Sequence, residues 1–319
     1  MKTTDRELKS DRRDSSNNKS KLLWGLSAIP ILLGVLVTWG LIEPYFIDEE
    51  EETAVVTNLP PEWSGKKVAQ VSDFQVGMWW DNTPTIARSV ERLIEEQPAA
   101  VLISGDFIYH ARPNPEKEIN EVIELIRPLT EANIPTYAVL GNHDYGMKGK
   151  NVKPDSKLAA QLETALENAG IKVLNNEAVK IPLQGQDSDL YLVGVDAHWA
   201  NNDRVDQALA QISSNSPRIA MMHNPKSFEA FPANTAPFAV AGHTHGGQIR
   251  LPFLPQWSWL SFPKGEEVHT DKWVEEDYGQ PGNSLYVNRG IGFSEIPIRI
   301  NCSPEITLFT LKSEGQPEN

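Results

Sequence analysis

Apolar positions recur along the chain in two patterns, as short continuous runs and as stripes at helical spacing. The runs predict buried strands at residues 67–71, 99–103, 136–140, 190–195, 218–222 and 238–241. The stripes predict helices around residues 84–94, 119–126, 158–166 and 205–212. Residues 285–311 predict two or three further strands. Strands that alternate with helices predict an α/β fold in which helices cover sheets.

The longest apolar stretch is residues 22–42, which contain no charged side chain. About 20 such residues suffice to cross a bilayer as a helix, and Trp24, Trp39 and Tyr45 lie near the ends, where aromatic belts sit. A basic tail precedes the stretch and acidic residues follow it. The positive-inside rule therefore places the N-terminus in the cytoplasm and the rest of the chain outside. A cleaved signal peptide and a buried core helix are the alternatives, although residues 39–43 form a poor cleavage site.

We therefore expect a single-pass protein of the cell membrane with five segments. They are a cytoplasmic basic tail at 1–21, a transmembrane anchor at 22–42, an acidic linker at 43–53, an extracytoplasmic α/β domain at 54–312 and a C-terminal tail at 313–319.

Charge and cysteine content exclude several classes of function. The net charge is −14, and the first 21 residues hold seven basic and four acidic side chains, so the remainder carries −17. A domain this acidic repels polyanions, and we expect no nucleic-acid partner. The single cysteine, Cys302, excludes an internal disulfide and cysteine-rich zinc or iron–sulfur sites.

Residue types that bind metals stand where the predicted strands end. They are Asp73, Asp106, Asn142, His143, Asp144, His223, His243 and His245, and they include four of the seven histidines. Ligands collect at strand ends in α/β sheets. Carboxylate, amide oxygen and imidazole together suit Mn²⁺, Fe or Zn²⁺, and the two oxygens of Asp106 could bridge two ions.

Structural roles are the alternatives at these positions. Asp73 and Asp106 could be solvated carboxylates, His143 a histidine bonded to backbone, and His223 a core histidine. Three further histidines stand in no motif and are expected to be structural, although the first two could line a pocket: His110, His198 and His269.

The motifs together resemble the calcineurin-like metallophosphoesterases. The resemblance lies in Ser-Asp-Phe-Gln at 72–75, Gly-Asp at 105–106, Gly-Asn-His-Asp at 141–144, His223 and Gly-His-Thr-His-Gly-Gly at 242–247. Residues 286–292, 297–299 and 304–306 resemble a membrane-anchored bacterial branch of that family. The resemblance covers about residues 55–312 and implies a layered β-sandwich flanked by helices, with phosphoester hydrolysis as the activity.

The resemblance also implies a role for each residue. Asp73, Asp106 and His245 would hold a first divalent ion, and Asp106, Asn142, His223 and His243 a second. A hydroxide between the ions would attack phosphorus in line, while His143, oriented by Asp144, would protonate the leaving oxygen. The ions implied are Mn²⁺, Fe or Zn²⁺, with Mg²⁺ as a further candidate.

One position departs from the family pattern, which usually has histidine where this chain has Gln75. An amide oxygen is neutral and a weaker donor than imidazole, so we expect a weaker first site that favours harder ions such as Mn²⁺ or Mg²⁺. Gln75 is either a metal ligand itself or a residue near the metal that bonds to water, and both interpretations stay open.

Aromatic residues follow the first and the last motif. They are Trp79, Trp80, Phe253, Trp257 and Trp259. These side chains either pack against the domain or form an apolar lip for a lipid-bearing substrate or the bilayer surface.

The expected function is hydrolysis of a phosphodiester or a pyrophosphate, with a lipid-linked molecule as one candidate substrate and the bilayer as a second partner through residues 22–42. The alternatives are a phosphomonoesterase, a single-metal enzyme, and a catalytically inactive binding module of the same fold.

Overall fold

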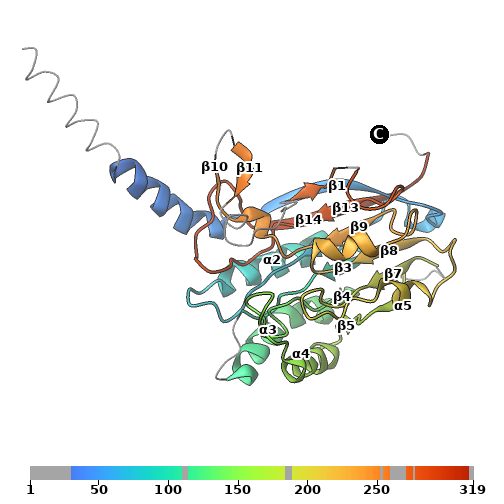
Figure 1. The fold of residues 1–319 in the computed structure, drawn as a ribbon, viewed down its shortest axis with the longest axis horizontal. Helices are drawn as coiled ribbons and strands as arrows, with labels where there is room; N and C mark the ends of the chain where they lie inside the picture. The colour runs from blue at the N-terminus through green and yellow to red at the C-terminus, as the bar shows by residue number, and fades with distance from the viewer. Residues whose placement is uncertain are drawn as a thin grey trace, which may run out of the picture.

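The structure is a computed structural model and describes residues 30–109, 114–183, 189–251, 254–258, 271–275 and 277–315. The described strands form two six-stranded sheets and a two-stranded hairpin (Figure 1). The first sheet has the order β1-β14-β2-β3-β4-β5 and comprises Asp48–Val56, Glu305–Ser313, Lys67–Val71, Ala100–Ile103, Thr136–Ala138 and Lys172–Val173. The second sheet has the order β12-β13-β9-β8-β7-β6 and comprises Lys272–Trp273, Leu285–Val287, Ala239–Ala241, Arg218–Met221, Tyr191–Gly194 and Glu177–Lys180. The hairpin pairs β10, Arg250–Leu251, with β11, Leu254–Ser258.

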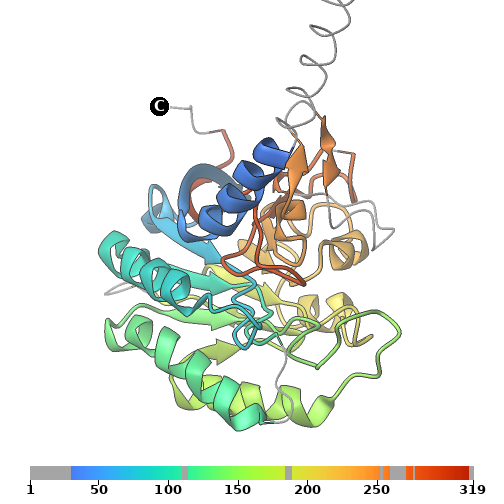
Figure 2. The same cartoon turned by 90° about the vertical axis from the view of Figure 1, so that its left-hand side faces the viewer.

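The two sheets pack face to face, with helices on their outer faces. Buried residues alternate along each strand: Leu102 of β3 faces the second sheet, while Ile103 faces the helices. The described helices are α2 (Thr83–Glu96), α3 (Pro115–Glu131), α4 (Ser156–Asn168) and α5 (Val205–Leu209). Helices α2, α3 and α4 lie side by side on the first sheet, and α5 packs on the second (Figures 1 and 2). The expected layered sandwich flanked by helices is confirmed.

The apolar patterns predicted the central elements because these are buried on both faces. Strands β2, β3, β4, β7, β8 and β9 and helix α5 fall within the expected stretches, and helices α2, α3 and α4 contain theirs and extend beyond them at both ends. The short strands β5, β6, β10, β11 and β12 were not predicted, since stretches of two to five residues carry little periodic signal.

The expected acidic linker at 43–53 is wrong. Residues Glu43–Tyr45 form a 3₁₀ helix, η1, and Asp48–Val56 form β1, which pairs in parallel with β14 along its whole length. The acidic side chains of β1 find basic partners, with Glu50 3.0 Å from Arg289. An edge strand tolerates charged side chains, so a run of acids does not by itself predict a linker. The described fold therefore begins before residue 54, and β14 ends at 313 rather than 312.

The predicted membrane anchor lies partly outside the described residues. Residues 30–42 are helical and project away from the two sheets (Figures 1 and 2), whereas 1–21 and 22–29 are not described. Within the described ranges, no helix combines the length and apolar character needed to span a bilayer.

The end of this helical segment docks onto the sandwich. The carbonyl of Gly40 accepts the backbone N–H of Arg299 at 2.9 Å, and a Cβ on Gly40 would come within 2.6 Å of the Ile298 side chain. The buried Glu43 carboxylate accepts the backbone N–H groups of Asn301 (2.9 Å) and Cys302 (2.5 Å). The helix is thus joined to the folded domain by buried contacts.

Candidate metal centre

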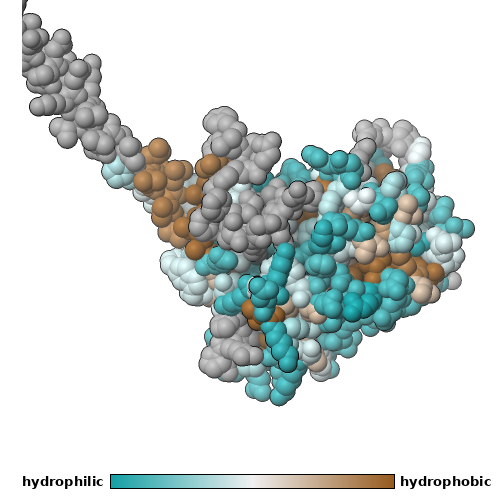
Figure 3. Space-filling view, viewed as in Figure 1, coloured by the Kyte–Doolittle hydropathy of each residue, from teal (hydrophilic) through white to brown (hydrophobic). Residues whose placement is uncertain are grey.

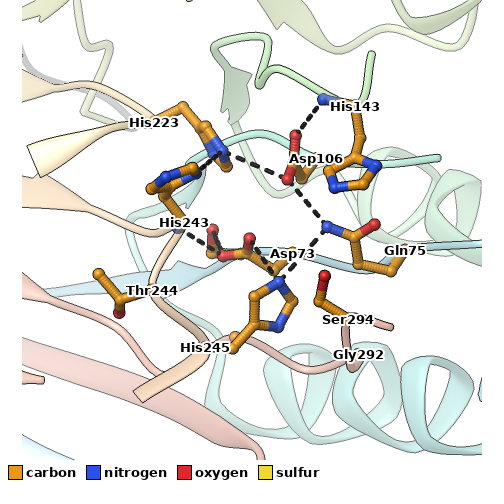
Figure 4. Close-up of polar contacts among 12 residues, drawn as sticks. Asp73, Gln75, Asp106, His143, His223, His243, Thr244, His245, Gly292 and Ser294 are labelled. Atoms are coloured by element: carbon orange, nitrogen blue, oxygen red, sulfur yellow. Dashed lines mark hydrogen bonds and ion pairs between the residues drawn. The ribbon is translucent and has the colours of Figure 1, made fainter. Parts of the chain in front are cut away.

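The ends of five strands bring the predicted site residues together. Parallel strands β2, β3 and β4 of the first sheet lead into the segments of Asp73, Asp106 and Asn142. Parallel strands β8 and β9 of the second sheet lead into those of His223 and His243. All five strands deliver their carboxyl ends to one edge of the sandwich, so these segments converge there. Figure 4 shows the side chains of Asp73, Asp106, His223 and His243 gathered at this edge.

The described residues contain two groups of ligand-type side chains that share one carboxylate. We name Asp106, His223 and His243 the strand-end group, and Asp73, Asp106 and His245 the braced group; within each, the ligand atoms lie within 4.8 Å of one another. His223 Nε2 is 3.3 Å from Asp106 Oδ2, and His245 Nε2 is 3.3 Å from Asp73 Oδ1. All these side chains are buried.

Backbone conformation at the site is unusual. Asp73, Asp106, His243 and His245 all adopt left-handed φ angles, of 54°, 58°, 74° and 49°. Such conformations cost on the order of 1–3 kcal/mol each for residues other than glycine, and the surrounding structure must impose them. A Cβ on Gly141 would lie only 2.1 Å from Asp106 Oδ1, so the shared carboxylate needs glycine there.

The electrostatics favour a bound cation. Burial raises the pKa of Asp73 to about 6. Burial would also raise the pKa of Asp106, but the charges of His223 and His143 outweigh it and hold that pKa below its usual range. Burial would lower the pKa of His223, yet the negative charge of Asp106 outweighs it and raises the pKa to about 9. A proton on His223 balances the buried carboxylates, and divalent ions would replace it.

Neighbouring backbone atoms orient the ligand atoms of the strand-end group. His223 Nδ1 lies 2.8 Å from the Ser104 carbonyl, which directs Nε2 into the centre. The amide of Asn142 donates to the Met147 carbonyl at 2.8 Å, which leaves Oδ1 facing His223 Nε2 at 3.3 Å. Asn142 therefore presents an oxygen, as a metal ligand must.

Gln75 lies inside the cluster. Its Nε2 donates to Asp106 Oδ2 at 2.8 Å and is 3.4 Å from His245 Nε2, while its buried Oε1 has no hydrogen-bond partner among the described residues (Figure 4). Half a turn of the amide would exchange these two atoms and present the oxygen to the braced group. The residues present thus fit a pair of divalent ions.

Asp144 and His143 each have partners that the sequence does not predict. The Asp144 carboxylate accepts backbone N–H groups from Gly141, Asp106, Phe107 and Ile108 at 2.8 to 3.2 Å. It therefore fixes the turn that carries Asp106. His143 donates its backbone N–H to Asp106 Oδ1 at 2.8 Å, and its Nδ1 lies 3.1 Å from the carbonyl of Tyr109, whose ring stacks on the imidazole. The Tyr109 carbonyl thus lies next to Nδ1 of the His143 ring, and the role of Asp144 in orienting that ring stays a prediction.

Arg299, to which the motifs assign no role, is a fully buried arginine that joins the loops of the braced group. Its guanidinium donates to the carbonyls of Arg289 (2.8 Å), Gly290 (3.0 Å) and Gly292. This loop in turn donates N–H groups to the Ser72 and Asp73 carbonyls. The same guanidinium reaches the carbonyl of His245 at 3.4 Å.

The signal for Arg299 was present but small. A single arginine between isoleucines in Ile298-Arg299-Ile300 is consistent with a buried cation, but only the fold shows which carbonyls it meets.

The predicted aromatic residues and the histidines outside the motifs lie away from the ligand groups or outside the described residues. Trp79 and Trp80 are 66% and 41% exposed, with Trp79 Nε1 on the Glu295 carbonyl and Trp80 Nε1 on the Tyr45 hydroxyl. They are not packed inside the domain. His198 is a surface partner of Asp203 at 2.7 Å. Phe253, Trp259, His110, His269 and the side chain of Trp257 lie outside the described residues.

Comparison with known proteins agrees with this geometry. Residues 66–247, more than half of the chain, match the family described as calcineurin-like phosphoesterase. The uncharacterized metallophosphoesterase YkuE of Bacillus subtilis is 28% identical over 277 residues, which cover 85% of this chain and 88% of YkuE. The phosphodiesterase YaeI of Escherichia coli is 29% identical over 220 residues, which cover 68% of this chain and 72% of YaeI. A transmembrane protein with metallophosphoesterase domain from Danio rerio is 26% identical over 310 residues, which cover 88% of this chain and 61% of that protein.

Proposed function

The chain belongs to the calcineurin-like phosphoesterase family, and from that premise we propose that it is a metal-dependent phosphodiesterase anchored in a membrane. Its family and its relatives make it a hydrolase of phosphoester bonds. One observation carries the proposal: two buried ligand groups share Asp106 at the edge where five strands end. A carboxylate shared in this way is suited to hold two ions close together.

The site residues would serve two roles in hydrolysis, metal binding and proton donation. Asp73, Asp106 and His245, with Gln75, would hold one ion, and Asp106, Asn142, His223 and His243 the other. When bound, Mn²⁺, Fe, Zn²⁺ or Mg²⁺ ions would lower the pKa of water to about 7 and neutralise charge on the phosphate. His143 would give a proton to the leaving oxygen from Nε2, since Nδ1 lies against the Tyr109 carbonyl.

Three observations support the choice of substrate and location. The relative YaeI is named a phosphodiesterase, and the Danio rerio relative is named a transmembrane protein. Residues 22–42 carry no charge, and the described part of this stretch exposes a row of apolar side chains (Figure 3): Ile31, Leu32, Leu33, Val35, Leu36, Val37, Trp39 and Ile42. Trp79 and Trp80 are exposed beside Tyr45, at the end of that helix. A lipid-linked substrate, held at the bilayer surface on the extracytoplasmic side, accounts for these features together.

The test uses the full chain in detergent micelles. We expect Mn²⁺-dependent hydrolysis of bis(4-nitrophenyl) phosphate that is faster than that of 4-nitrophenyl phosphate and stops when a chelator is added. A faster monoester reaction would assign a phosphomonoesterase. Absence of chelator-sensitive turnover on both substrates would contradict the proposal and favour the inactive binding module.

Membrane anchoring has its own test. The full chain is expected to stay in the membrane fraction after carbonate extraction, and externally added protease should digest the domain in spheroplasts. Release by carbonate, or protection from the protease, would contradict the proposed location.

A further inference from the structure

Two lysines lie beside the metal centre on the segment that follows Gly-Asn-His-Asp. Lys148 Nζ lies 4.2 Å from the ring centroid of Tyr109, and Lys150 Nζ lies 5.9 Å from that of Trp199. Both distances are within the range of a cation–π contact, which holds an ammonium group over an aromatic face. Both side chains are exposed.

Each of these aromatic rings contacts a histidine of the centre. Tyr109 stacks on His143 with centroids 5.0 Å apart, and Trp199 meets His243 edge to face with centroids 4.9 Å apart. Each lysine is therefore one aromatic ring away from a site histidine. The Tyr109 ring contacts both the Lys148 ammonium group and His143. The Trp199 ring contacts both the Lys150 ammonium group and His243.

The charge of this segment contrasts with that of the whole chain. The chain carries −14, and such a protein repels anionic substrates at long range. Two lysines within three residues, beside the centre, offset that repulsion locally. At physiological ionic strength the Debye length is about 8 Å, so these lysines act mainly on groups bound next to them.

We propose that Lys148 and Lys150 form a subsite for a second anionic group, carried by the leaving part of the substrate; this rests on the proposed phosphodiesterase function. In hydrolysis, water gives a proton to solvent and its oxygen bonds to phosphorus. The bond from phosphorus to the leaving oxygen breaks, and that oxygen keeps the electron pair and takes a proton from His143, which solvent then restores. Lys148 lies on the His143 side, where the leaving part must lie. A carboxylate or a second phosphate there, as in a pyrophosphate, would meet its ammonium group.

The test compares two esters that differ by one charge, methyl phenyl phosphate and methyl 4-carboxyphenyl phosphate, with release of the phenol measured by chromatography. The protein should prefer the carboxylated ester by roughly 5-fold in kcat/KM, chiefly through KM, because an ion pair in solvent contributes about 1 kcal/mol. The double variant Lys148→Ala/Lys150→Ala should lose this preference and retain turnover of methyl phenyl phosphate, the ester without the carboxylate. Lys153→Ala, an exposed lysine of the same segment, is the matched control and should keep the preference.

A binding measurement separates this proposal from the proposed function. Phenylphosphonate and 4-carboxyphenylphosphonate cannot be hydrolysed, and calorimetry should show the same preference in the Mn²⁺-loaded protein and its loss in the double variant. Turnover without any preference, or a preference that survives the double substitution, would overturn the subsite alone. If the protein shows no turnover but prefers 4-carboxyphenylphosphonate, and the double variant loses that preference, the subsite is supported and the phosphodiesterase function is contradicted.

Discussion

The two ligand groups of the metal centre are built in different ways, although they share Asp106. In the strand-end group, His223 and His243 stand two residues after the ends of the neighbouring strands β8 and β9. In the braced group, His245 stands two residues further on, in the 3₁₀ helix η4 (His245–Gly247), and a buried arginine joins its loop to the loop behind Asp73. The sheet fixes one half of the centre, and hydrogen bonds between loops fix the other.

The two groups also differ in the number and kind of ligands that they offer a metal ion. The strand-end group adds a well-oriented Asn142 oxygen to two imidazoles. The braced group has one imidazole, and the neutral Gln75 stands where the family usually has a second. We therefore expect the strand-end group to bind its ion more tightly, and the braced group to lose its ion first.

Removing the shared charge should have the largest effect, because it breaks both groups. Asp106→Asn is expected to abolish binding of both ions and to lower kcat/KM by about 10³-fold or more, since the ions supply several kcal/mol of transition-state stabilisation. Metal analysis after gel filtration measures the binding. Retention of two ions by this variant would show that Asp106 is not shared.

His143→Ala should separate chemistry from metal binding. Loss of a general acid costs about 10²-fold or more in kcat, and the variant should keep both ions because the imidazole is not counted among their ligands. The His143 backbone N–H, which donates to Asp106, remains in the variant. An equal loss of metal would instead make His143 a ligand.

Arg299→Lys should weaken the braced group selectively. A lysine cannot donate to four carbonyls in two loops at once, so the affinity of the weaker ion is expected to fall about 10- to 100-fold while the tighter ion is retained. Arg218→Lys is the matched control, since Arg218 is also buried and also bonds to backbone carbonyls, those of Ser213, Ser214 and Ser216, but at the start of β8 rather than at its end. Equal metal loss in both variants would indicate general destabilisation.

Substitution of Gln75 should give the smallest change and decide its role. Gln75→His is expected to raise the affinity of the weaker ion by about 10-fold and to shift its preference from Mn²⁺ toward Zn²⁺, because imidazole is a softer donor than an amide oxygen. Gln75→Ala should lower that affinity. Unchanged stoichiometry and affinity in Gln75→Ala would make Gln75 a neighbour of the ions and not a ligand.

The sequence predicted the convergence of ligands because strand ends are local features. Apolar runs such as 99–103 mark a buried strand, and the polar residue that follows must lie at the edge of the sheet. Parallel strands bring such residues together at one edge, so the convergence can be predicted before the order of the strands in the sheet is known.

Features that depend on partners distant in sequence were not predictable. The sequence predicts Asp144 as a partner of the adjacent His143, and it gives no sign that the Asp144 oxygens accept backbone N–H groups of the turn around Asp106. The acids of residues 48–52 read as a linker because their partners Arg289 and Lys272 lie more than 200 residues away. The role of Arg299 likewise can be inferred only from the folded structure, in which the loops of Asp73 and His245 lie side by side.

Stepwise titration of the protein with Mn²⁺, followed by electron paramagnetic resonance, tests the central claim most directly. Two ions that share one carboxylate lie about 3.5–4 Å apart and must be magnetically coupled. We predict two equivalents, a tight ion followed by a weaker one, with the coupled signal appearing only as the second binds and absent in Asp106→Asn. A single equivalent, or two equivalents without coupling, would contradict the account.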